Sequence, residues 1–208
     1  AVTCDYFGDG NSGGDTLDLN FQGMVEDIEN IYLYSKDKYR IQKYALVGLR
    51  VGANTALAAQ GRIHDVQNLI MIEPVLNLID VIKTGLRANL TNQMTIHKKI
   101  LKTRDMLFQD IKNGNPVNMD GFLVGKNLWD SFEKTGTLLG DPEFGGKAVI
   151  ISMDNNAKIN EQYASLAHQF KRGTVIKIER EFIWTGWKYY NPSPPIFMET
   201  ILNELVRE

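Results

Sequence analysis

The sequence predicts an α/β protein in which helices flank a parallel sheet, with a helical cap inserted between two of its strands. The main observation is an alternation of short apolar, β-branched runs with segments of helical periodicity, which is typical of parallel strands joined by crossover helices. The second is the helical stretch 75–146, which contains no clear strand pattern. The third is the length of 208 residues, 43% of them hydrophobic, which suits one domain with a full core.

The strands are expected where apolar or β-branched residues are concentrated. These segments are 1–5, 44–47, 67–72, 147–152 and 174–179. The segments with helical spacing or small helix-forming residues follow or precede them: 22–39, 53–60, 159–171 and 195–206. The order of these segments predicts right-handed crossovers between parallel strands.

The stretch 75–146 is too long for a simple crossover and too patterned for a disordered loop. It carries amphipathic patterns near 77–88 and 92–112 and a weaker one near 124–135. We therefore expect a core made of 1–74 and 147–208, with 75–146 as the helical cap.

Composition argues against several classes of protein. There are 23 basic and 25 acidic residues, so the net charge of −2 does not favour a nucleic-acid binder. One cysteine and three histidines leave little for a zinc site, and we expect no metal and no cofactor. The single cysteine favours a reducing compartment, and neither a secretion leader nor an apolar run long enough to span a bilayer is visible. These features together predict a cytoplasmic protein.

The sharpest local feature is the turn between the predicted strand 44–47 and the helical segment that follows. Gly48 and Gly52 lie two positions either side of Arg50, which permits a tight strand-to-helix turn. This is the frame of a nucleophile elbow, G-x-S-x-G, with arginine in the place of serine. The simpler interpretation is an ordinary βα turn that contains two glycines. A guanidinium stays protonated at any relevant pH and cannot be the nucleophile.

A second glycine-rich turn precedes the first helical pattern. Residues 5–14 read DYFGDGNSGG, which has the form D-x-x-G-x-G-x-S-x-G. A phosphate-binding loop is the alternative, but no G-x-x-x-x-G-K-[ST] is present, and Asp9 and Asp15 would repel phosphate.

With these two turns in this order, the chain resembles the α/β-hydrolases. It resembles in particular the exosortase A system-associated hydrolases, in the branch with arginine at the serine position. The segments that carry the resemblance are GLRVGA at 48–53, LRANLTNQM at 86–94, MDGFL at 119–123, and EFIW at 181–184 followed by Pro194, Pro195 and Thr200. Glu181 stands where that family has proline. The resemblance implies an α/β-hydrolase-like sheet with a cap and an association with exopolysaccharide production.

The resemblance also locates the remaining triad positions. Asp154 matches the acid position, whereas the loop 181–190, where the histidine belongs, contains none. His64, His97 and His168 are expected to be ordinary surface or cap residues. Ser12 and Ser152 are hydroxyls near strand ends with turn or core roles, and Cys4 is expected to be a buried, inert thiol within a strand.

Three strands of the hydrolase fold would precede residues 1–5 and would need roughly 60 residues at ordinary loop lengths. Their absence leaves an open slot beside the strand 44–47, and unpaired backbone there is costly. Three explanations are open: residues precede Ala1 in the natural protein, a second chain or copy completes the sheet, or the sheet closes up.

An arginine at the elbow, beside a helix N-terminus, favours an anion above the strand ends. The alternative is an internal ion pair with Asp154 or Glu73. The candidate ligand-binding residues are Arg50, Leu49, Glu73, Asp154 and Trp184. The aromatic side chains of 182–190 could line a site for an acyl chain or a sugar face, or could pack in the core.

Two function classes follow. The first is a hydrolase-fold protein with a degenerate triad that binds an anionic, acyl or carbohydrate ligand, or a partner, without hydrolysing it. The second is an ester or thioester hydrolase that uses an unrecognised nucleophile.

Overall fold

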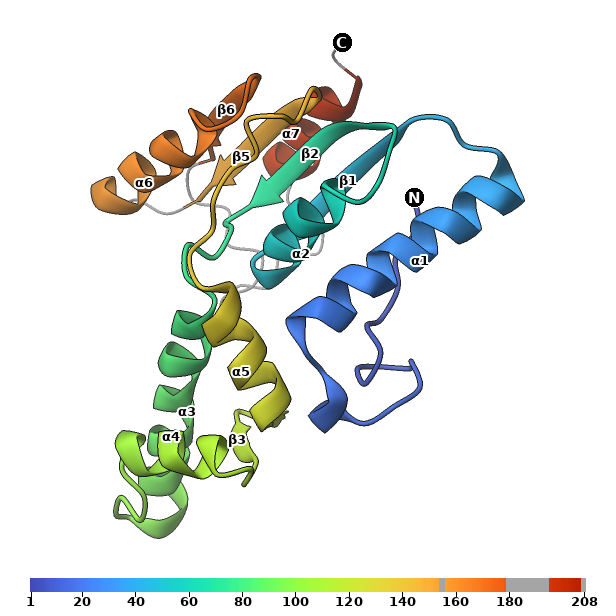
Figure 1. Ribbon diagram of the computed structural model, residues 1–208. Helices are drawn as coiled ribbons and strands as arrows, with labels where there is room; N and C mark the ends of the chain where they lie inside the picture. Colours follow the sequence, from blue (N-terminus) through green and yellow to red (C-terminus); the bar gives the residue numbers. More distant parts are fainter. Residues whose placement is uncertain (154–155, 179–194, 207–208) are drawn as a thin grey trace. The chain divides into compact units, whose positions relative to one another are not determined.

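Four parallel strands form the main sheet (Figure 1). The computed structural model describes residues 1–153, 156–178 and 195–206. The strands are β1 (Tyr44–Leu49), β2 (Val66–Ile72), β5 (Lys147–Ser152) and β6 (Gly173–Lys177), in the order β1-β2-β5-β6. Each neighbouring pair is parallel, which confirms the predicted α/β architecture and four of the five predicted strands.

Helices cover the sheet as the alternation predicts. These are α2 (Val51–Gln60), α6 (Ala157–Ala167) and α7 (Pro195–Val206); the helix expected near 22–39 is also formed, as α1 (Phe21–Tyr39). Phe197 of α7 packs on the face of the sheet that carries Ile70 and Val149. Side chains alternate along a strand, so Leu69 and Ile150 point to the opposite face, and both are fully buried. Helices α2 and α6 contact the strands of this sheet.

The prediction of a strand at 1–5 is wrong. These five residues have no strand conformation, and all of them are exposed. None of the described strands pairs with 1–5, so its backbone gains no ladder hydrogen bonds. β-prone composition alone does not form a strand, because a strand is stabilised by a neighbour.

The stretch 75–146 contains the three expected helices with different boundaries: α3 (Ile79–His97), α4 (Arg104–Lys112) and α5 (Lys126–Thr135). The predicted continuous segment 92–112 is broken. Helix α3 ends at His97, and the residue that follows, Lys98, has a left-handed backbone with φ 57°. The Gln93 side chain then accepts hydrogen bonds from the N–H groups of Leu101 and Lys102, and Thr103 caps α4.

A small antiparallel hairpin, which the sequence reasoning missed, follows α4. Its strands are β3 (Val117–Met119) and β4 (Phe122–Val124), and it forms a sheet of its own. The two loop residues Asp120 and Gly121 have φ 53° and 96°. Positive φ at both positions is the type I′ turn that Asp-Gly favours.

The chain divides into two compact units. The first joins 1–31 to 75–138, and the second joins 32–74 to 139–208. Within the first unit, the Phe21 N–H donates to Ser131 Oγ over 3.0 Å, and the rings of Phe21 and Phe132 meet edge to face. The division into a core and a cap, with 1–74 in the core, stays a prediction. No helix in the described part of the chain is both long and apolar enough to cross a membrane.

Candidate functional site

The turn between β1 and α2 has the backbone of a nucleophile elbow. Arg50 lies at its apex with φ 53° and ψ −121°. Its N–H donates to the Ile72 carbonyl over 2.9 Å, and its own carbonyl accepts from the Ala53 N–H over 3.0 Å. This backbone region is essentially restricted to glycine, so a non-glycine residue here persists only because the surrounding structure fixes it. The apex therefore stores strain at the carboxyl edge of the sheet.

The two glycines of the turn have different roles. A Cβ at Gly48 would lie 2.5 Å from the Ala53 nitrogen and closer still to the Gly52 carbonyl oxygen. A Cβ at Gly52 would meet no heavy atom within 4 Å. The close approach of strand and helix therefore requires glycine at 48 and not at 52.

The Arg50 side chain is exposed at this edge. Its Nη1 lies 3.4 Å from the Glu73 backbone carbonyl, a long hydrogen bond. No ion pair is recorded between Arg50 and a carboxylate in the described ranges, so the expected pair with the Glu73 carboxylate is not observed. A guanidinium with one weak acceptor can bind a further anion.

The buried Glu73 side chain forms hydrogen bonds that hold the carboxyl edge of the sheet together. The residue is only 4% exposed and follows β2 with φ 45°. One carboxylate oxygen accepts the N–H of Met153, which directly follows β5, and the other accepts the hydroxyl of Tyr163 on α6 over 3.1 Å. The Tyr163 hydroxyl also lies 3.0 Å from the Pro74 carbonyl. The carboxylate thus ties the ends of two strands to α6, next to the elbow.

Of the three other candidate residues, the structure describes only Leu49. Leu49 ends β1 and is 38% exposed beside Arg50. Asp154 and Trp184 lie outside the described residues, so their proposed roles stay predictions. Tyr163, which the sequence reasoning missed, carries no local signal, because it meets Glu73 only through the packing of α6.

Among the described residues, no hydrogen bond joins a serine hydroxyl to a histidine ring. Ser152 is fully buried, and its Oγ lies 2.7 Å from Asn160 Oδ1. His64, His97 and His168 are exposed, as expected. The described residues include no group of three His, Cys, Asp or Glu side chains that could hold a metal ion.

The loop 5–14 is closed by its own hydrogen bonds. The Asp5 carboxylate accepts the Asn11 N–H over 2.8 Å, and the Ser12 hydroxyl donates to the Asp5 carbonyl over 2.7 Å. These contacts give Ser12 the turn role that was expected.

Cys4 differs from its prediction. It is exposed and lies outside any strand, so the expected buried thiol is wrong. Partial desolvation of the sulfur, and then the carboxylates of Asp27 and Asp5, raise the pKa of the thiol. A raised pKa disfavours the nucleophilic thiolate, so an inert thiol is still expected, because of partial desolvation of the sulfur and the two nearby carboxylates.

Comparisons with solved structures identify the fold. The chain is similar to Est1E from Butyrivibrio proteoclasticus, which was solved with ferulic acid, at a TM-score of 0.64 and 14% identity over 98% of this chain and 76% of that one. It is similar to mouse alpha/beta hydrolase domain-containing protein 10 at a TM-score of 0.56 and 18% identity, over 97% and 75%. An alpha/beta hydrolase from Sphaerobacter thermophilus gives a TM-score of 0.56 and 15% identity, over 95% and 80%.

No family model matches the sequence, and no curated protein does either. At such low sequence identities, the similarity to these structures shows the fold and does not show the activity or the substrate. The parallel sheet, the flanking helices and the elbow agree with it: the chain has the α/β-hydrolase fold.

Proposed function

We propose that this chain binds the carboxylate of a small acyl ligand at Arg50 and does not hydrolyse it. The observation that carries the proposal is the guanidinium at the elbow apex. It is exposed at the carboxyl edge, it has one weak acceptor, and it lies at the N-terminus of the ten-residue helix α2. The positive end of a helix and a guanidinium both favour a negative charge at the same place.

Hydrolysis needs an activated nucleophile, and the described residues offer none at this edge. The guanidinium holds its proton, and the Ser152 hydroxyl is buried against Asn160. The absence of a histidine from the sequence 181–190 supports the same conclusion, because a hydroxyl requires a base within hydrogen-bond reach.

The resemblance to the exosortase A-associated hydrolases extends the proposal. On this resemblance we propose that the acyl or carbohydrate ligand belongs to exopolysaccharide production; the single cysteine separately favours the cytoplasm. Leu49, exposed beside Arg50, is suited to contact the apolar part of such a ligand.

Calorimetric titration with butyrate tests the binding. We expect Arg50→Ala to weaken binding roughly tenfold or more, since hydrogen bonds to charged groups contribute about 1.5–3 kcal/mol. Arg50→Lys should retain part of the affinity, because it keeps the charge and loses the planar fork. Arg87→Ala is the matched control: Arg87 is an exposed arginine on α3, and its loss should leave the dissociation constant unchanged. Equal affinity in the unmodified and Arg50→Ala chains would contradict the proposal.

A second measurement separates binding from hydrolysis. A fluorophosphonate probe labels activated serines, and we expect no labelling of the unmodified chain and no ester turnover by Arg50→Ser. Probe labelling that maps to one serine, with turnover of a butyrate ester, would establish the alternative ester or thioester hydrolase.

A further inference from the structure

A second feature lies at the opposite, amino edge of the same sheet. A cavity of about 460 Å³ opens there, and three basic residues line it: Lys43, Lys147 and Arg172. The amide side chains of Gln67 and Asn68 also line it, with Leu205 of α7 on the apolar side. The elbow is at the carboxyl end of β1, so this cavity is separate from the Arg50 site.

Lys43, Lys147 and Arg172 are called the basic row, and the strand register brings two of them, Lys147 and Arg172, side by side. Ala45, Asn68 and Lys147 are aligned across β1, β2 and β5. Ala148 is aligned with Gly173, so Arg172 lies beside Lys147 at the start of β6. Lys43 directly precedes β1, whose register against β2 shifts between Tyr44 and Ala45, and it lines the same cavity. Neighbouring strands lie about 4.8 Å apart, which keeps Lys147 and Arg172 within the reach of one ligand.

The charge of this row is not balanced by the described carboxylates. Lys147 Nζ pairs with the Glu204 carboxylate at 2.7 Å, with side-chain exposures of 19% and 8%. Neither Lys43 nor Arg172 has a recorded ion pair within the described ranges. Like charges on adjacent strands repel one another and destabilise the sheet. An anion bound between Arg172, Lys43 and Lys147 would reduce this repulsion.

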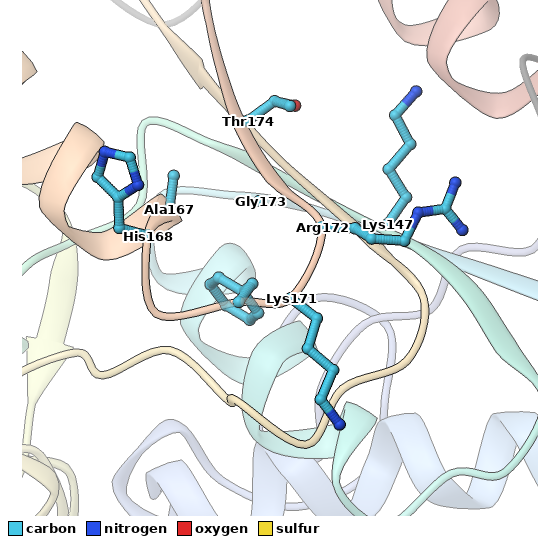
Figure 2. Close-up of a pocket in the computed structure, with 8 residues that line it drawn as sticks. Lys147, Ala167, His168, Lys171, Arg172, Gly173 and Thr174 are labelled. Carbon is cyan, nitrogen blue, oxygen red and sulfur yellow. The ribbon is translucent and has the colours of Figure 1, made fainter.

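A smaller neighbouring cavity, of about 290 Å³, shares Lys147 and Arg172 with the first. Figure 2 shows these two residues beside one another, with His168 on the other side of the cavity. His168 is at the C-terminal end of α6, where the helix dipole is negative and disfavours an anion. Lys171, which also lines the smaller cavity, is paired with Glu143 at 3.4 Å. Both observations favour the larger cavity for an anionic group.

We propose that this cavity, the amino-edge site, binds the phosphate group of a small phosphorylated ligand. Arg172 presents a planar fork that matches phosphate oxygens, Lys43 supplies a second charge, and Lys147 adds a charge that Glu204 holds in place. Two cations without recorded partners match a dianion better than a single carboxylate. The apolar side chain of Leu205 suits the remainder of the ligand.

The test is calorimetric titration with inorganic phosphate at constant ionic strength, in the Arg50→Ala background. In that background the Arg50 site does not bind an anion, so the titration measures phosphate binding at the amino-edge site alone. A negative result would therefore count against the amino-edge site and not against the Arg50 site. We expect one site, with the dissociation constant raised roughly tenfold or more by Arg172→Gln and by Lys43→Gln, because each removes a charge-assisted hydrogen bond.

Lys171→Gln is the matched control, since Lys171 adjoins Arg172 in sequence and lies outside the row. It removes the same charge, and the dissociation constant should change by less than about twofold, as for an exposed charge screened by salt. Equal weakening by Lys171→Gln and Arg172→Gln would indicate diffuse attraction to a basic surface and overturn the proposal. Absence of phosphate binding to a folded Arg50→Ala chain, with unchanged circular dichroism, would overturn it too.

Discussion

Replacing Gly48 by alanine should destabilise the protein strongly, because the new methyl group has no room. It would lie 2.5 Å from the Ala53 nitrogen and closer to the Gly52 carbonyl, so the backbone must withdraw by about 1 Å to reach ordinary contact. These atoms belong to the first turn of α2, where the Arg50 carbonyl accepts the Ala53 N–H. Overpacking typically costs about 1–3 kcal/mol, and an overlap with hydrogen-bonded backbone belongs at the upper end.

The matched control is Gly52→Ala, in the same turn. A Cβ there meets nothing within 4 Å, and alanine favours a helix over glycine by about 0.5–1 kcal/mol. We therefore expect Gly52→Ala to raise the melting temperature by a few degrees at most, and Gly48→Ala to lower it by about 6–12 °C, measured by circular dichroism. Similar melting temperatures for the two variants would refute the close strand–helix approach on which the elbow depends.

Three further predictions address the strain, the open edge and the thiol. Arg50→Gly should be more stable than Arg50→Ala by about 1–3 kcal/mol in urea unfolding, because glycine adopts φ 53° without strain; an alanine variant as stable as the glycine variant would contradict this. The edge of β1 away from β2 has no partner among the described strands, and Val47 and Leu49 are 47% and 38% exposed, so light scattering should show self-association or a co-purifying chain that supplies a strand. A monodisperse monomer at high concentration would count against that prediction. Cys4 should react with iodoacetamide more slowly than free cysteine at pH 8, and Asp27→Asn should accelerate the reaction because it removes a charge that raises the thiol pKa; an unchanged rate in the variant would remove the electrostatic explanation.

The elements that the sequence predicts correctly are those determined by local chemistry. The elbow follows from Gly48 and the strand-to-helix pattern around it, because the glycine requirement is set by atoms only four or five residues away. The type I′ hairpin at Asp120-Gly121 was equally local. It was missed because the helical periodicity of its surroundings dominated the interpretation of 75–146.

The features that could not be predicted from the sequence depend on contacts between residues that are far apart along the chain. The segment 1–5 has β-prone composition, but no neighbouring strand accepts it in the described chain. Tyr163 and Glu73 meet across 90 positions. The basic row forms only when strand register brings Lys147 and Arg172 together at one edge. Such convergence is produced by the fold, and single-sequence patterns do not encode it.

The most direct measurement of the central claim follows the Arg50 guanidinium itself. Its Nε–H resonance in a proton–nitrogen spectrum can be assigned by its loss in Arg50→Lys and then followed as butyrate is added. We predict a saturable shift of this resonance with one site per chain, while the Arg87 Nε–H resonance stays in place. An Arg50 resonance that does not move at saturating butyrate, or one that moves together with Arg87, would contradict the account.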